Sequence, residues 1–143
     1  MSKQITDLKI GLLGGGQLGR MLMQEAVNWN LQVSILEPSK DAPCAHLVPD
    51  FVVGDFKDYD TVYQFGKDKD IVTIEFEDVN SDALAQLEQE GVQVFPQPSV
   101  LKIIQDKGLQ KQFYQNNNIP TAPFALVNNK AEIAACGIQT PFF

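Results

Sequence analysis

Residues 8–21 read LKIGLLGGGQLGRM, an apolar run that passes through a glycine turn into a helical pattern. Gly14, Gly16 and Gly19 have the spacing G-x-G-x-x-G, and Glu37 follows near the end of the next apolar run. The first two glycines leave a phosphate group room to reach backbone N–H groups, and Gly19 lets the helix lie close on the strand. The stretch therefore predicts a strand, a phosphate-sized turn and a helix.

Short apolar runs alternate with helical patterns from Lys9 to Pro98, which is the order of βαβ units. We expect an α/β fold with a Rossmann-like parallel five-strand sheet and helices on both faces. Such sheets bind ligands at the carboxyl ends of their strands, so the glycine turn, Glu37 and residues 75–78 should converge. The expected strands are residues 9–13, 32–36, 51–53, 71–76 and 92–95, and the expected helices are residues 17–29, 59–65 and one that begins after Asn80 or Ser81 and closes at Gly91.

The pattern changes after Pro98, where mainly helical stretches follow. About forty residues are too few for a separate core, so we expect residues 1–98 to form one domain and residues 99–143 the incomplete beginning of another. On this interpretation the chain is an N-terminal piece of a larger enzyme. The expected segments are helices at residues 99–105 and 109–116, a loop at 118–123, an apolar run at 124–127, a short helix before Gly137, and a strand just begun at 140–143.

The composition limits the classes of partner. A net charge of −7 with 11 scattered Lys and Arg residues argues against nucleic acid binding. No run approaches the roughly 20 apolar residues of a membrane span, and no signal peptide precedes the first strand, so we expect a cytoplasmic protein without a membrane partner. Cys44, Cys136 and the single histidine, His46, lack partners at metal-ligand spacing, so no metal site is expected within the chain.

Four motifs occur in order: GGGQLGRM in the first turn, VTIEFEDV at residues 72–79, QDKGLQK at 105–111 and NIPTAPF at 118–124. Together they make the chain resemble the N5-carboxyaminoimidazole ribonucleotide synthetase family of ATP-grasp enzymes over essentially its whole length. The resemblance implies a pre-ATP-grasp domain followed by the start of an ATP-grasp domain. It implies an ATP-dependent carbon–nitrogen ligase of de novo purine (IMP) biosynthesis. Such an enzyme converts aminoimidazole ribonucleotide, bicarbonate and ATP to N5-carboxyaminoimidazole ribonucleotide, ADP and phosphate through carboxyphosphate.

The resemblance also implies which residues bind the substrate. The turn would hold the 5′-phosphate of the ribonucleotide through Gly15, Gly16, Gln17 and Leu18. Thr73, Glu75 and Glu77 alternate along the strand expected here and should point to one face, because alternate residues of a strand share a face. Glu75 is the expected substrate contact, supported by Glu77 or Asp78, although solvated acids at a strand end would give the same pattern.

Lys107, in QDKGLQK, matches the family position from which a Lys or Arg reaches the ATP phosphates. The resemblance places the ligands of Mg²⁺ and the rest of the ATP site beyond residue 143, so no catalytic residue and no metal ligand is expected here. We therefore expect the chain alone to be inactive. A homodimer is implied by the resemblance only.

Two other functions stay open at the level of sequence. An NAD-dependent oxidoreductase would use the same fingerprint with Glu37 on a ribose hydroxyl, although Pro38 follows at once and no catalytic Lys, His or Tyr constellation appears downstream. A non-catalytic domain that binds a phosphorylated metabolite would need only the sheet and its glycine turn. A glycine turn used solely for tight packing of the helix on the strand is the fourth interpretation of the motif.

Overall fold

The computed structural model describes residues 4–138 of the chain. The chain divides into two compact units, Met1–Lys102 and Ile103–Phe143. The domain boundary after residue 98 stays a prediction, and the strand expected at residues 140–143 lies outside the described residues.

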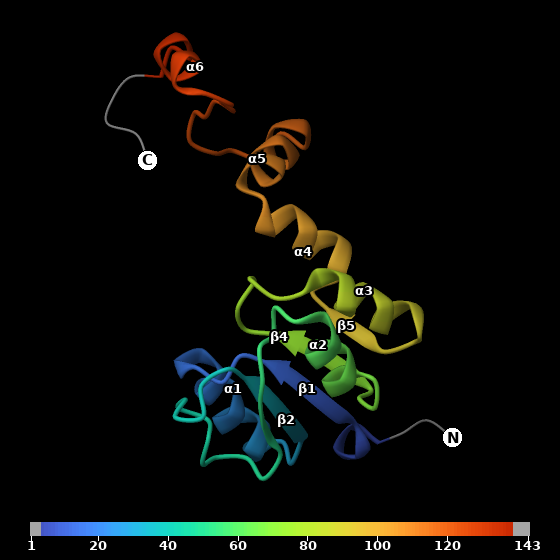
Figure 1. Ribbon diagram of the computed structural model, residues 1–143. Coiled ribbons are helices and arrows are strands. Elements are labelled where there is room, and N and C mark those ends of the chain that lie inside the picture. Colours follow the sequence, from blue (N-terminus) through green and yellow to red (C-terminus); the bar gives the residue numbers. More distant parts are fainter. Residues whose placement is uncertain (1–3, 139–143) are drawn as a thin grey trace. The chain divides into compact units, whose positions relative to one another are not determined.

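The first unit is built on a five-stranded sheet in the order β3-β2-β1-β4-β5, in which every neighbouring pair is parallel (Figure 1). The chain starts at the centre with β1, adds strands on one side, and then crosses to the other side with β4. The predicted parallel five-strand α/β sheet is therefore confirmed. The strands are β1 (Lys9–Leu13), β2 (Gln32–Glu37), β3 (Phe51–Val53), β4 (Ile71–Ile74) and β5 (Gln93–Phe95), and a short 3₁₀ helix, η1 (Ile5–Asp7), precedes them.

Helices cover both faces of this sheet. Leu12 packs with Met23 of α1 (Gln17–Asn28) in one core cluster, whereas its neighbour Leu13 packs with Leu84 of α3 (Ser81–Gln89) in the other. Consecutive residues of a strand point to opposite faces, so β1 contributes to both cores. The second cluster also holds Val62 and Phe65 of α2 (Tyr59–Gly66) and Leu101 of α4 (Pro98–Gln105).

One polar cap and one glycine set the two ends of α3, as the sequence predicts. The Asn80 side chain accepts a hydrogen bond from the Ala83 N–H at 2.9 Å, which makes Asn80 the N-cap. Gly91, just past the helix end, has φ of +98°, a conformation that residues with a Cβ rarely adopt.

The strand expected at residues 71–76 is wrong at its carboxyl end, since β4 stops at Ile74. The Glu75 N–H still donates to the Leu13 carbonyl at 2.9 Å, but β1 ends at Leu13 and its chain turns away into the glycine turn. The registers of β4 with β1 and with β5 end at Ile74 and Thr73, so the ladder does not reach residues 76 and 77. The alternation argument that paired Glu75 with Glu77 on one strand face therefore fails.

The second unit contains α5 (Lys107–Asn116) and α6 (Lys130–Ala135). The helix expected from residue 109 begins at Lys107, because the Asp106 carboxylate accepts from the N–H groups of Gly108 and Leu109 at 2.8 and 3.0 Å. The intervening residues 117–129 form no helix or strand. They are held to α5 by Lys111, whose Nζ donates to Thr121 Oγ1 at 2.6 Å.

Gly19→Ala tests the close approach of α1 to β1. A Cβ at Gly19 would lie 2.4 Å from the Gly14 carbonyl oxygen, which is backbone and has little freedom to move. We expect the free energy of unfolding, measured by urea denaturation, to fall by about 1–3 kcal/mol despite the higher helix propensity of alanine. Gln24→Ala, on an exposed position of the same helix, is the control and should change it by less than about 0.5 kcal/mol. An equally small effect at Gly19 would contradict this account of the packing.

Candidate phosphate-binding site

The glycine turn lies at the carboxyl end of β1, where the chain enters α1. Gly14 has φ of +116°, and its N–H donates to the Leu36 carbonyl of β2 at 3.0 Å. Gly16 is the N-cap of α1 and provides no capping side chain. The N–H groups of the first helical turn, at Gln17 and Leu18, therefore have no side-chain cap, and both residues are exposed. A helix end of this kind attracts an anion through its N–H groups and its dipole.

Glu37 lies against the turn, as the sequence predicts. Its Oε2 accepts a hydrogen bond from the Gly15 N–H at 2.7 Å, and its Oε1 accepts from the Ser39 N–H at 3.2 Å. The carboxylate thus bonds to protein backbone on both oxygens. The sequence predicts this residue at the turn, and it offers a contact to a ribose hydroxyl only under the oxidoreductase alternative.

Glu75 approaches the turn from the end of β4 and is half-buried. Its Oε2 lies 3.0 Å from where a Cβ of Gly14 would be and 3.9 Å from where a Cβ of Gly16 would be. The structure therefore brings Glu75 to the turn, together with Glu37. Glu77 is exposed on the same segment, and Asp78 forms an ion pair with Lys57 that raises the pKa of that lysine.

Cys44 contacts the backbone of the turn, a contact that sequence reasoning missed. Its N–H donates to the Gly15 carbonyl at 3.1 Å, and its thiol is fully buried. Burial, followed by the negative charges of Glu37 and Glu75, raises the pKa of the thiol, while Arg20 acts in the opposite direction. The thiol therefore stays protonated near neutral pH, and no sequence pattern at this lone cysteine signalled its place.

Lys107, the expected ATP-binding residue, belongs to the second compact unit. It is the first residue of α5, it is exposed, and its Nζ donates to the Ile104 carbonyl at 3.4 Å. Within residues 4–138, no group of three or more His, Cys, Asp or Glu side chains is placed to hold a metal ion. The described part of the chain has no helix of the length and apolar character that a membrane span requires.

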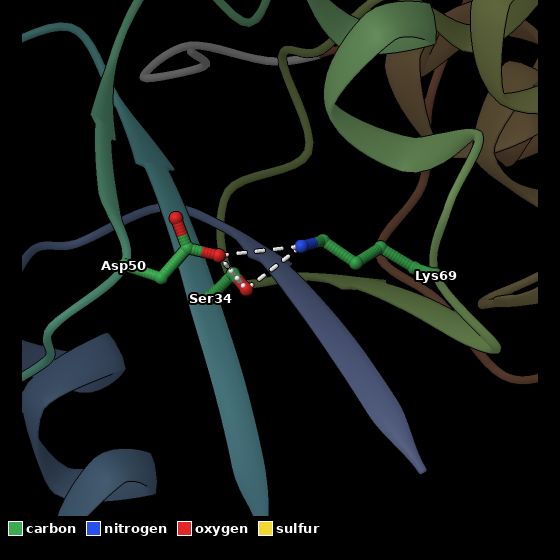
Figure 2. Close-up of polar contacts among 3 residues, drawn as sticks. All are labelled: Ser34, Asp50 and Lys69. Atoms are coloured by element: carbon green, nitrogen blue, oxygen red, sulfur yellow. Dashed lines mark hydrogen bonds and ion pairs between the residues drawn. The ribbon is translucent and has the colours of Figure 1, made fainter.

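A second polar cluster lies at the opposite, amino-terminal edge of the sheet (Figure 2). Lys69 Nζ donates to Ser34 Oγ at 2.8 Å and lies 3.4 Å from Asp50 Oδ2, to which the Ser34 hydroxyl also donates. The three side chains line one side of an open pocket of about 500 Å³ whose other walls include Met23 and Val27 of α1. Asp50 and Lys69 each stand just before a strand, a placement that could have signalled this edge from the sequence.

The strand order reverses direction at β1, and the uncapped start of α1 lies at this point. These two features define a Rossmann-like domain of the class that binds phosphate groups or nucleotides. The ribonucleotide synthetase preATP-grasp domain family matches residues 8–105. The chain belongs to this family, which confirms the resemblance of its motifs.

Relatives and solved structures agree with this assignment. The chain is 36% identical over 136 residues to the N5-carboxyaminoimidazole ribonucleotide synthase of Pseudomonas aeruginosa, covering 94% of this chain and 37% of that protein. It is 35% identical over 125 residues to the phosphoribosylaminoimidazole carboxylase of Ogataea methanolica, covering 85% and 23%. The N5-carboxyaminoimidazole ribonucleotide synthetase of Thermotoga maritima superposes with a TM-score of 0.82 at 34% identity, over 91% of this chain and 36% of that one.

A further similar structure is a complex. The N5-carboxyaminoimidazole synthase of Aspergillus clavatus, crystallised with ADP and aminoimidazole ribonucleotide, superposes with a TM-score of 0.81 at 35% identity, over 94% of this chain and 36% of that one. The chain spans between 23% and 37% of the length of these relatives.

Ser34→Ala tests the cluster at the amino-terminal edge. The Ser34 hydroxyl is the largest cause of the lowered pKa of Asp50, followed among the favourable ones by the charge of Lys69. Removing it should lower the free energy of unfolding by about 1–2 kcal/mol at neutral pH, because hydrogen bonds to two charged groups are lost. Ser99→Ala, at an exposed position of α4, is the control.

The effect of Ser34→Ala should depend on pH in a fixed direction. A carboxyl group whose pKa is lowered by folding contributes stability above its unfolded pKa of about 3.9, and that contribution is lost as the pH falls through the folded pKa. The difference between wild type and variant should therefore be constant from about pH 7 to 5 and shrink below about pH 4. Urea denaturation across this range is the measurement, and a difference that stays constant down to about pH 3 would contradict the role of Asp50.

Proposed function

We propose that this chain is the N-terminal, substrate-binding part of an ATP-dependent carboxylating ligase of de novo purine biosynthesis. The reaction would convert aminoimidazole ribonucleotide, bicarbonate and ATP to N5-carboxyaminoimidazole ribonucleotide, ADP and phosphate. Membership of the ribonucleotide synthetase preATP-grasp family and the names of the relatives support the reaction. The observation that carries the assignment of the substrate to this chain is the uncapped start of α1 at the glycine turn, with Glu75 beside it.

The turn would bind the 5′-phosphate of the ribonucleotide. The N–H groups of Gly16, Gln17 and Leu18 stand at the start of α1, where a phosphate receives hydrogen bonds and the favourable end of the helix dipole. Gly15 would serve the site by its small size, since a Cβ there would lie 3.1 Å from Ile35 and 3.2 Å from Glu37. A side chain at Gly15 would push the turn away from the strands that position it.

Glu75 would bind the ribose hydroxyls or the amine of the substrate. Its carboxylate accepts hydrogen bonds and lies beside the turn, with Oε2 3.9 Å from where a Cβ of Gly16 would be. Glu77, on the same segment, would support it. Lys107 would bind the ATP phosphates as a point charge on a long stem, from the ATP-grasp part that we place at residues 99–143.

We base the co-substrates and the assembly in this proposal on membership of the family. ATP, with Mg²⁺ held by residues outside this chain, would activate bicarbonate as carboxyphosphate, which then transfers its carboxyl group to the amine of the ribonucleotide. The part of that reaction assigned to this chain is to bind and orient the ribonucleotide. A homodimer and a cytoplasmic location belong to the same proposal.

Neither alternative from the sequence gains support. The comparisons favour the ligase over an oxidoreductase. The Glu37 carboxylate, which an oxidoreductase would use on a ribose hydroxyl, bonds instead to the N–H groups of Gly15 and Ser39. No observation favours a non-catalytic binding domain over the ligase.

Calorimetric titration of the chain with aminoimidazole ribonucleotide tests the proposal. Gly16→Val should weaken binding by about tenfold or more, because its β-branched side chain would cover the N–H groups at the helix start. Glu75→Gln should weaken it by about tenfold, because the amide keeps an acceptor oxygen but loses the charge that strengthens its hydrogen bonds.

Glu25→Gln, which removes the same charge from an exposed position of α1, is the matched control and should bind like the wild type. Binding that neither Gly16→Val nor Glu75→Gln weakens would contradict the assignment of the substrate to this turn.

A further inference from the structure

The backbone N–H and the carbonyl of Gly15 both form hydrogen bonds within the protein. Its N–H donates to Glu37 Oε2 at 2.7 Å, and its carbonyl accepts from the Cys44 N–H at 3.1 Å. The Gly15 N–H is therefore already occupied, whereas the N–H groups of the first turn of α1, which follow it along the chain, have no side-chain cap. The glycine turn as folded offers a ligand fewer donors than its sequence suggests.

The Glu37 side chain is fixed where it makes this bond. Its other carboxylate oxygen accepts from the Ser39 N–H at 3.2 Å, its own carbonyl accepts from the Gly54 N–H at 3.1 Å, and the residue is half-buried. The two hydrogen bonds hold the carboxylate at the turn. A ligand that needs the Gly15 N–H must displace an anion that the protein itself supplies.

We propose that Glu37 is a positioning and specificity-determining residue, whose carboxylate occupies the Gly15 N–H and restricts the turn to a single phosphate group. A monophosphate needs only the donors at the start of α1. A pyrophosphate spreads over more backbone donors, and its second phosphate would meet the Glu37 carboxylate where it needs the Gly15 N–H. The inference rests on the proposed function in that it explains why this glycine fingerprint would take a ribonucleotide 5′-monophosphate instead of a dinucleotide.

Two variants separate the hydrogen bond from the charge. Glu37→Ala removes both, whereas Glu37→Gln keeps an oxygen that can accept from Gly15 but carries no charge. Glu25→Gln is again the control for an equal change of net charge. The measurement is NMR titration of the labelled chain with inorganic phosphate, inorganic pyrophosphate and aminoimidazole ribonucleotide, followed at the amides of the glycine turn, together with hydrogen exchange of the Gly15 amide.

Glu37→Ala should raise the affinity for pyrophosphate relative to phosphate by about tenfold or more, because it frees a donor and removes a like charge. It should also speed exchange of the Gly15 amide by about tenfold or more. Glu37→Gln should give a smaller rise in the affinity ratio with nearly unchanged exchange, and Glu25→Gln should match the wild type.

An affinity ratio in both Glu37 variants equal to that of the wild type would overturn the proposal, as would a turn whose amides respond to neither anion. If Glu37→Ala does not fold, the affinity ratio in Glu37→Gln decides. Should the ratio change as expected while aminoimidazole ribonucleotide binds to no form of the chain, the proposed substrate is wrong and the role of Glu37 stands.

Discussion

The contact between Gly19 and the Gly14 carbonyl is the constraint on which the rest of the site depends. With 2.4 Å between that oxygen and the position of a Cβ, only glycine lets α1 start this close to β1. The close start places the first N–H groups of α1 at the carboxyl edge of the sheet. Beside it, β4 pairs with β1 as far as the Glu75 N–H, so that the end of this strand brings the Glu75 carboxylate to the turn.

The two edges of the sheet carry different kinds of polar group. At the carboxyl edge, Glu37 and Glu75 lie beside backbone N–H groups that attract an anion. At the amino-terminal edge, Ser34, Asp50 and Lys69 bond to one another and join segments that precede β3 and β4 to the middle of β2. At the amino-terminal edge, opposite charges therefore pair with each other. At the carboxyl edge, the protein keeps backbone donors for a ligand, and its two carboxylates restrict which ligand can bind.

Much of the fold could be predicted from the sequence because local signals determine it. The glycine spacing, the apolar runs and the Asn80 cap act over a few residues and gave the parallel sheet, its helices and the turn. The end of β4 could not be found this way, because it depends on where β1 leaves the sheet. The bond from Gly15 to Glu37 and the Ser34 cluster join residues far apart in sequence, and only the folded backbone brings them together.

A crystal structure of the chain with aminoimidazole ribonucleotide is the most direct test of the central claim, that the start of α1 is a site for one phosphate group. We predict the phosphate within hydrogen-bond distance, about 3 Å, of the N–H groups of Gly16, Gln17 and Leu18. Glu75 should contact the ribose or the amine, and Glu37 should still accept from Gly15. A phosphate bound away from this turn, or one that displaces Glu37 from Gly15, would contradict the account.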